Sequence, residues 1–109
     1  MTEYSSNIRS DFLDYIIRER GYSEYTAISY RRDINQFIDF MESYLGEALH
    51  NFSTVDKPAI RHFLGKEFEA GYSSKTVARR LATLKSFFKY LVQAEIVSHN
   101  PAAAIQSPK

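Results

Sequence analysis

The sequence contains no cysteine and no tryptophan, only three prolines and four glycines, and almost no net charge, formally +1 over 109 residues. The absence of cysteine excludes disulfides and thiolate metal sites. No apolar stretch approaches the length of a membrane-spanning helix, so we expect no membrane partner. The first residues, 1–6, are neither basic nor apolar enough for a secretion signal, so we expect a cytoplasmic protein.

Hydrophobic residues make up 44% of the chain and aromatic residues 15%, which is enough for one domain with a sizeable core. The sequence contains no residue pattern that is typical of a catalytic site. The three histidines stand far apart, no glycine-rich phosphate loop occurs, and no serine lies in a nucleophile elbow. We therefore expect no metal, no cofactor and no catalysis by this chain.

A six-residue motif is repeated. Residues 21–26, Gly-Tyr-Ser-Glu-Tyr-Thr, return fifty positions later as residues 71–76, Gly-Tyr-Ser-Ser-Lys-Thr. A glycine just past a helix supplies a left-handed residue, and a serine two positions later can cap the next helix. Similar turn chemistry alone could explain the repeat. However, matching apolar positions follow each copy, such as Phe37 and Phe87, and these favour two related helical hairpins.

Helical periodicity covers most of the chain, and no run alternates apolar and polar residues as a strand does, so the predicted fold class is all-α. The first helix is expected over about residues 7–20, capped by Ser5 or Ser6, and the second over 24–45. The third is expected from Thr54 or Asp56 to about residue 70, and the fourth over 74–94. The segment between the second and third helices, through residue 53, is expected to be a linker. Asn100 and Pro101 predict a short helical turn through Ile105. Two short loops and one longer connection allow either two crossed hairpins or an up-down bundle.

The third helix is expected to bury Ile60, Phe63, Leu64 and Phe68, and the fourth carries an unusual charge pattern. Between Ala70 and Ala94 there are five basic residues and no acid. At 100° per residue, the outward face of the fourth helix holds Lys75, Thr76, Arg79, Thr83, Ser86 and Lys89. Arg80 falls on the flank, where its stem can lie along the core or its charge can meet a ligand. The whole face is either a solvated surface or a binding stripe.

The outward face of the second helix is mixed. It holds Tyr25, Ser29, Arg32 and Gln36, with Ile28 and Asn35 beside them. The exposed Tyr25 and Ile28 are either scattered surface residues or contacts to a partner such as base edges. For Asp33 we expect a structural pair with a nearby arginine. Each of these two helices begins with Ser-x-x-Thr, and a helix N-terminus with hydroxyls and cations suits phosphate.

Several segments together resemble one family, the tyrosine recombinases, and within it the N-terminal core-binding domain of Xer-type recombinases and phage-like integrases. These segments are residues 12–15 (Phe-Leu-Asp-Tyr), 19–23 (Glu-Arg-Gly-Tyr-Ser), Thr26 with 30–33 (Tyr-Arg-Arg-Asp), 71–81, 84–88 and 100–102. The resemblance covers nearly the whole chain. The third-helix region, with Pro58 and Gly65, departs from the family pattern.

The resemblance implies a SAM-like four-helix bundle of two crossed hairpins, plus the short C-terminal helical turn. In the family this domain is one half of a clamp on double-stranded DNA, and its second and fourth helices face the major groove. The implied DNA contacts are Thr26, Ser29, Arg32, Lys75, Thr76 and Arg79. Secondary candidates are Tyr25, Ile28, Gln36, Arg80, Thr83 and Ser86.

The family's catalytic residues belong to a later domain, so this chain is expected not to be an enzyme by itself. Residues 1–105 are expected to form the DNA-binding domain, and residues 106–109 the start of a linker to the catalytic domain. We expect no arm-binding domain before Ser5, which would favour a Xer-like or simple integrase over the larger phage type. Expected partners are DNA and other recombinase protomers, with the isolated domain monomeric and nucleoid-associated. The alternative is a helical protein-interaction module whose basic face meets an acidic partner.

Overall fold

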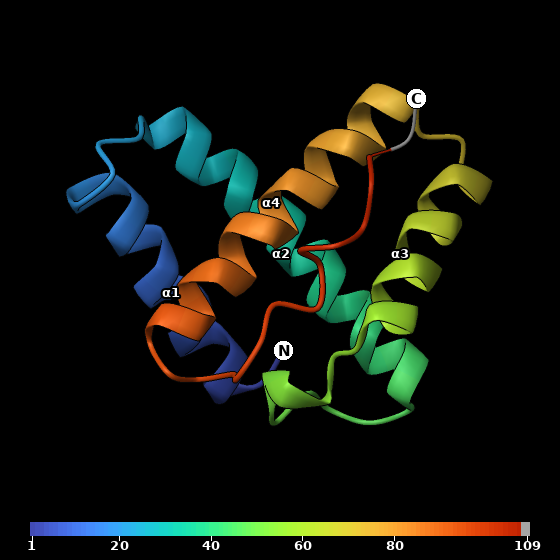
Figure 1. The fold of residues 1–109 in the computed structure, drawn as a ribbon, viewed down its shortest axis with the longest axis horizontal. Coiled ribbons are helices and arrows are strands. Elements are labelled where there is room, and N and C mark those ends of the chain that lie inside the picture. The colour runs from blue at the N-terminus through green and yellow to red at the C-terminus, as the bar shows by residue number, and fades with distance from the viewer. Residues whose placement is uncertain (108–109) are drawn as a thin grey trace. The chain divides into compact units, whose positions relative to one another are not determined.

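The computed structural model describes residues 1–107, and these residues form two compact units. The first unit is Met1–Asn51, and the second begins at Phe52. The described residues contain four α-helices, one short 3-10 helix and no strand (Figure 1). The predicted all-α fold is therefore confirmed. Pro108 and Lys109, which belong to the expected linker, lie outside the described residues.

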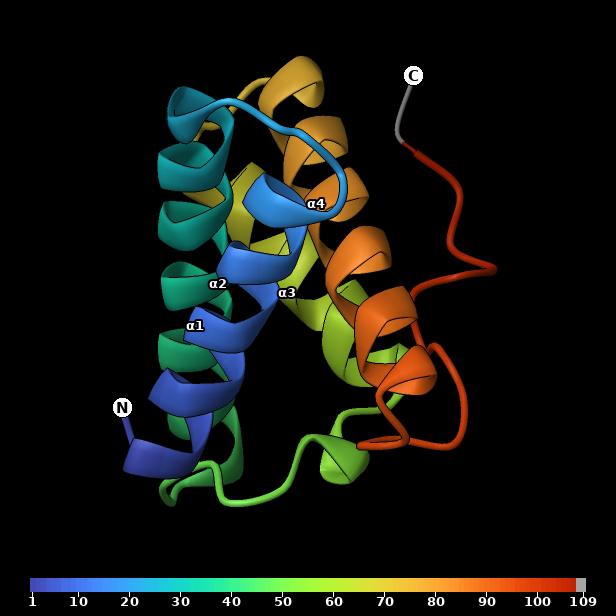
Figure 2. The same cartoon turned by 90° about the vertical axis from the view of Figure 1, so that its left-hand side faces the viewer.

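The first unit is a hairpin of α1 (Glu3–Arg18) and α2 (Glu24–Leu45), which lie alongside each other in Figure 2. The bounds of α2 agree with the prediction, because Ser23 caps its start and Gly46 ends it in a left-handed conformation (φ 72°). The core side chains come from both helices, and the ring of Phe12 stacks on Tyr30 with 6.1 Å between centroids. Buried apolar residues of the two helices are Ile8, Phe12, Ile16, Ala27, Ile34, Phe37, Ile38 and Met41.

The predicted start of α1 is wrong. The helix begins at Glu3, because Thr2 rather than Ser5 or Ser6 caps it and accepts a hydrogen bond from the Ser5 N–H at 3.1 Å. Ser5 is fully buried, and its hydroxyl donates to the Leu49 carbonyl at 3.1 Å, which also accepts from the Thr2 hydroxyl at 2.8 Å. A long-range contact with Leu49 therefore draws the N-terminus into the helix. The helix also ends at Arg18, two residues before the predicted Arg20.

The second unit contains η1 (Phe52–Thr54), α3 (Lys57–Glu69) and α4 (Ser74–Gln93). Asp56 caps α3 by accepting from the Ala59 N–H at 2.9 Å, and Pro58 lies in the first turn, where its missing N–H costs nothing. Gly71 is left-handed (φ 93°) and closes the corner between α3 and α4. Two backbone bonds hold this corner, from Gly71 N–H to the Phe68 carbonyl at 3.0 Å and from Tyr72 N–H to the Glu67 carbonyl at 3.2 Å.

Two expectations about the core of this unit are wrong. The segment after α2 is more than a linker, because Phe52 is fully buried and its ring meets Phe87 edge to face at 5.2 Å. Phe68, expected inside, is 43% exposed. The buried residues of α3 follow i, i+3, i+4, i+7 spacing from Ile60, so Glu67 takes the last interior position and Phe68 lies at the edge of the arc.

The chain after α4 returns to the same unit. The Asn100 side chain accepts from the Ala102 N–H at 3.0 Å and donates to the Lys85 carbonyl at 3.1 Å, which ties this segment to α4. Consecutive turns follow, with Ala103 N–H bonded to the Asn100 carbonyl at 3.3 Å. Val97, Ala102 and Ile105 are buried, so residues 97–105 complete the core of the second unit.

Candidate nucleic-acid interface

The start of α4 is built by its capping serine. Ser73 has extended backbone (φ −70°, ψ 159°), and its Oγ accepts from the Thr76 N–H at 3.2 Å. The Ser73 hydroxyl also donates to the Thr76 hydroxyl oxygen at 3.1 Å. These bonds leave Thr76 half-buried, while the neighbouring Lys75 is exposed. The first turn therefore presents a cation beside the positive end of the helix dipole, which together suit an anion.

The start of α2 repeats this geometry with different charge. Ser23 accepts from the Thr26 N–H at 3.1 Å, and the two hydroxyls lie 3.0 Å apart. Where the second copy of the motif has Lys75, the first copy has Tyr25, which is 86% exposed, and the first turn of α2 carries the acid Glu24. This helix start is therefore less attractive to an anion than the start of α4.

The exposed cations of the two helices lie where the sequence predicted. Arg79 and Lys89 are exposed on α4, and Arg32 is exposed on α2. Ile28, also on α2, is 56% exposed, as expected for an outward position. Ser29, Gln36 and Ser86 are half-buried, so their side chains are only partly accessible. No acid lies among residues 70–94, so α4 contains nothing that neutralises Lys75 and Arg79 from within its own sequence.

The expectation that Thr83 faces outward is wrong. Its side chain is fully buried, and its hydroxyl donates to the Arg79 carbonyl at 3.2 Å, one turn back along the helix. Thr83 lies at the edge of the predicted outward arc, toward Phe87, and the bond to the backbone satisfies its hydroxyl in the interior. Thr83 therefore offers no surface to a ligand.

Arg80 is a packed residue. It is 4% exposed and forms an ion pair with Glu67, which is itself 8% exposed. The guanidinium carbon lies 4.1 Å from the ring centroid of Tyr72, a cation–π contact. Of the two interpretations from sequence, the structure supports packing along the core. Sequence reasoning missed Glu67, although a lone carboxylate in the apolar stripe of α3 is the signal of a buried ion pair.

Further positive charge lies on the first unit. Arg9 of α1 donates from Nη1 to Oδ1 of Asn35 on α2 at 2.5 Å. Burial lowers the pKa of Arg9, and the nearby positive charge of Arg31 lowers it further. Asp33 is buried at 1% exposure, so its carboxylate belongs to the interior and does not lie among the exposed groups of α2.

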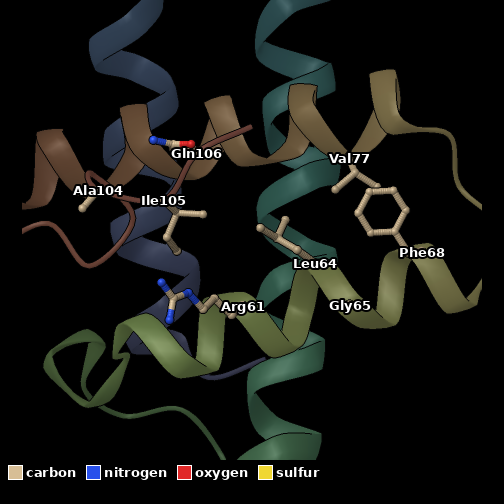
Figure 3. Close-up of a pocket in the computed structure, with 8 residues that line it drawn as sticks. All are labelled: Arg61, Leu64, Gly65, Phe68, Val77, Ala104, Ile105 and Gln106. Atoms are coloured by element: carbon tan, nitrogen blue, oxygen red, sulfur yellow. The ribbon is translucent and has the colours of Figure 1, made fainter. Parts of the chain in front are cut away.

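A hollow of about 560 Å³ lies on the second unit, between α3, the start of α4 and the C-terminal segment. Its lining is mainly apolar, and in Figure 3 Leu64 and Ile105 point into it while Arg61 lies at its rim. Only Arg61 among its lining residues is charged. The hollow lacks the pair of acid and base groups that a hydrolytic site would need.

The described part of the chain has neither a cluster of metal ligands nor a membrane-spanning helix. Within residues 1–107, no three histidine, cysteine, aspartate or glutamate side chains gather as metal ligands would. No helix in this part is both long and apolar enough to cross a membrane.

Comparison with known proteins identifies relatives over almost the whole chain. Residues 10–95 match the family model "Phage integrase, N-terminal SAM-like domain". The chain is 38% identical over 98 residues to tyrosine recombinase XerC of Anoxybacillus flavithermus, covering 90% of this chain and 32% of that protein. It is 35% identical over 104 residues to tyrosine recombinase XerD of Listeria monocytogenes, covering 95% of this chain and 34% of that protein.

A third relative, XerC of Halalkalibacterium halodurans, is 36% identical over 100 residues, which are 92% of this chain and 32% of that protein. The chain thus spans about a third of the length of the curated relatives it matches. No solved structure matches it significantly. The family match covers most of the two helical hairpins described above, and the chain belongs to the phage integrase family as an N-terminal SAM-like domain.

Proposed function

We propose that the chain binds double-stranded DNA as the N-terminal clamp domain of a site-specific tyrosine recombinase or integrase. The parent protein would carry out DNA recombination or integration, with other recombinase protomers as partners and the nucleoid as its location. The isolated chain would be monomeric. The relatives support the recombinase role, since both XerC and XerD are named tyrosine recombinases.

The observation that carries this proposal is the pair of exposed cations at the start of α4, a helix whose own sequence contains no acid. Lys75 and Arg79 are both exposed, one turn apart, and they follow directly from the capped helix start at Ser73. Backbone N–H groups, the helix dipole and two cations all favour a phosphate at this end of the helix. Phosphate contacts position a protein on duplex DNA, and exposed side chains further along the helix can then read base edges. Thr76 is half-buried beside these groups and adds a hydroxyl.

A second set of contacts comes from α2. Arg32 supplies a cation, and Thr26 and Ser29 supply half-buried hydroxyls. Tyr25 and Ile28 are the large exposed apolar side chains of this helix start, at 86% and 56% exposure. Apolar groups on a groove-facing helix can contact thymine methyl groups, which a phosphate-binding residue cannot do. In this proposal α4 contributes more affinity and α2 contributes more of the contact with bases.

Salt dependence tests the proposal directly. Each phosphate neutralised on duplex DNA contributes about −0.9 to the slope of log affinity against log salt. Replacing Lys75 and Arg79 together with alanine is therefore expected to weaken binding of a labelled duplex and to reduce the slope by up to about 2. Fluorescence anisotropy at several salt concentrations measures both quantities.

The matched control is the double variant Arg61→Ala/Lys66→Ala on α3. Both of these side chains are exposed, so the variant removes the same charge from a different surface. It is expected to retain most of the affinity and slope. Equal losses in the two variants would indicate attraction by net charge alone. Unchanged binding by the Lys75/Arg79 variant would show that the proposed surface of α4 is wrong.

The alternative is an acidic protein partner for the same basic surface. An acidic partner also binds in a salt-dependent way, so the discriminating measurement is the ligand itself. Duplex DNA that shifts the amide resonances of residues 74–89 during an NMR titration supports DNA binding. Shifts confined to α1 and α3 would contradict it.

A further inference from the structure

The buried ion pair of the second unit connects three segments. Glu67 lies in the last turns of α3, Arg80 lies in the second turn of α4, and Tyr72 lies in the corner between them. The carboxylate of Glu67 pairs with Arg80, and the Glu67 carbonyl accepts from the Tyr72 N–H at 3.2 Å. The ring of Tyr72 in turn lies against the guanidinium at 4.1 Å. One residue of α3 therefore holds both the corner and the following helix.

The ion pair of this cluster lies next to the proposed DNA contacts without sharing their exposure. Arg80 directly follows Arg79 and lies one turn after Thr76, yet it is 4% exposed while Arg79 and Lys75 are exposed. Since Glu67 neutralises Arg80 at close range, this arginine adds little to the positive potential of α4. The Arg80 guanidinium faces the corner between α3 and α4, where it contacts Glu67 and Tyr72.

The corresponding corner of the first unit lacks this charge pair. There Tyr22 meets Tyr30 edge to face at 6.0 Å, and Tyr30 occupies the position fifty residues before Arg80. Ion pairs and cation–π contacts depend on direction, whereas apolar contacts largely do not. The first corner has a cation–π contact of its own, from the exposed Arg20 to the Tyr22 ring at 5.6 Å. What distinguishes the unit with the stronger proposed phosphate site is therefore the buried ion pair at its corner.

We propose that Arg80, held by Glu67 and Tyr72, is a positioning residue for DNA binding. The cluster fixes the direction in which α4 leaves the corner, and so it sets where Lys75, Thr76 and Arg79 point. Arg80 itself does not touch the DNA. This inference rests on the proposed function of the α4 surface.

The test replaces the ion pair without changing the net charge. The double variant Glu67→Met/Arg80→Met fills a similar volume with apolar side chains. Proteins often stay folded and stable when a buried ion pair is replaced in this way. Long-range attraction to DNA stays the same, but the directional contacts are lost. We expect about tenfold weaker duplex binding, a size typical of coupling through a packed network. The control Lys66→Met/Glu69→Met removes an exposed ion pair of the same helix, whose atoms lie 3.7 Å apart, and should bind as the parent does.

A positioning role has a further signature. In the Lys75→Ala/Arg79→Ala background, the Glu67→Met/Arg80→Met change should cause no additional loss, because the residues that it orients are gone. Equal additional loss in that background, or parental binding by Glu67→Met/Arg80→Met alone, would overturn the inference while leaving the α4 surface intact. Parental binding by the Lys75/Arg79 variant would instead remove the proposed function and this inference together.

A second variant keeps the inference testable if Glu67→Met/Arg80→Met misfolds. Tyr72→Leu keeps the ion pair and changes a side chain that is 42% exposed, so the fold should tolerate it. Circular dichroism and thermal unfolding check that each variant is folded at the binding temperature. If Glu67→Met/Arg80→Met does not fold, Tyr72→Leu decides the question. A loss of about threefold in the parent and none in the Lys75/Arg79 background supports positioning, and any other pattern overturns it.

Discussion

Glu95, the residue that follows the C-cap of α4, has the left-handed backbone conformation (φ 60°) that side chains with a Cβ seldom adopt. The hydrogen bonds that end α4 explain why Glu95 adopts this conformation. Ile96 N–H bonds to the Leu91 carbonyl at 2.9 Å, and Glu95 N–H bonds to the Val92 carbonyl at 3.0 Å, the pattern in which glycine is preferred. The same pattern ends α3, where Gly71 occupies the corresponding position.

Replacing Glu95 with glycine is therefore expected to stabilise the protein. Relief of the left-handed strain should raise the free energy of unfolding by up to about 1 kcal/mol, less the entropy that glycine adds to the unfolded chain. Urea denaturation measures the change. Gly71→Ala provides the opposite control and should destabilise by about 1 kcal/mol or more. A loss of stability in Glu95→Gly would mean that the glutamate side chain makes a contact worth more than the strain.

Gly65 offers a second stabilising change, inside a helix. It lies in the middle of α3, is exposed, and a Cβ built on it meets nothing within 4 Å. It lines the hollow of Figure 3 without filling it. Gly65→Ala should therefore raise the free energy of unfolding by about 0.5 to 1 kcal/mol, because alanine is the better helix former. Thermal unfolding would contradict this if the melting temperature fell.

Single residues were predictable from the sequence where the helix face alone decides their exposure. Lys75, Arg79 and Tyr25 lie in the middle of outward arcs and are exposed as expected. Residues at the edges of arcs were not predictable. Thr83 and Phe68 both lie there, and what covers an edge position depends on neighbours that a helical wheel does not contain. The same limit applies to the partner of Arg80.

At the scale of elements, the repeated motif produces two similar helix starts, and the two copies differ in the side chain on which the motif's tyrosine packs. In each copy the serine caps the helix through a bond from the threonine N–H, at 3.1 Å in α2 and 3.2 Å in α4. In each copy the tyrosine packs on the side chain eight positions later, which is Tyr30 in the first unit and Arg80 in the second. The motif therefore specifies a corner as well as a cap.

The two caps should contribute equally to stability but unequally to DNA binding. Ser73→Ala and Ser23→Ala each remove one acceptor, and each should lower the free energy of unfolding by about 1 kcal/mol. Ser43→Ala, at an exposed position within α2, should be neutral or stabilise by a few tenths, about 0.2 to 0.5 kcal/mol. Only Ser73→Ala should clearly weaken duplex binding, because it loosens the helix start that carries Lys75. Equal weakening by Ser23→Ala would contradict the larger role given to α4.

Helix boundaries were predictable where a local cap sets them. Ser23 and Gly46 define α2, and Ser73 defines the start of α4, as the sequence indicated. The start of α1 was not predictable in this way, because it depends on hydrogen bonds from Thr2 and Ser5 to Leu49, more than forty positions away. Phe52 was missed for a related reason, since a short 3-10 segment has no periodicity that marks its buried residues.

At the scale of the whole molecule, charge is separated along the chain while the net charge stays near zero, at +1. Five of the fourteen basic residues lie in the acid-free segment between Ala70 and Ala94, so the acids outnumber the bases elsewhere. A local positive surface on a nearly neutral protein attracts phosphate over short distances, within the Debye length of about 8 Å at physiological salt. This distribution favours binding in one orientation over general attraction to nucleic acid.

The connection between the two units is anchored on both sides by contacts within each unit. On one side Leu49 accepts from Thr2 and Ser5 through its carbonyl and donates from its N–H to Glu42 at 3.0 Å. On the other side Phe52 packs on Phe87. The two residues between them, at positions 50 and 51, are exposed. Tolerance to insertion depends in part on the burial of the affected segment, so extra residues at these exposed positions should cost less than at the corner between α3 and α4.

Inserting Gly-Ser-Gly between His50 and Asn51 should lower the free energy of unfolding by less than about 1 kcal/mol, since loop entropy grows slowly with length. The same insertion between Tyr72 and Ser73 should cost more than about 2 kcal/mol, because it separates Tyr72 from Arg80 and moves the cap of α4 away from the corner. Urea denaturation of both variants measures the difference. Equal costs at the two sites would mean that the connection is as tightly specified as the corner, and that residues 50 and 51 hold a structural role beyond joining the two units.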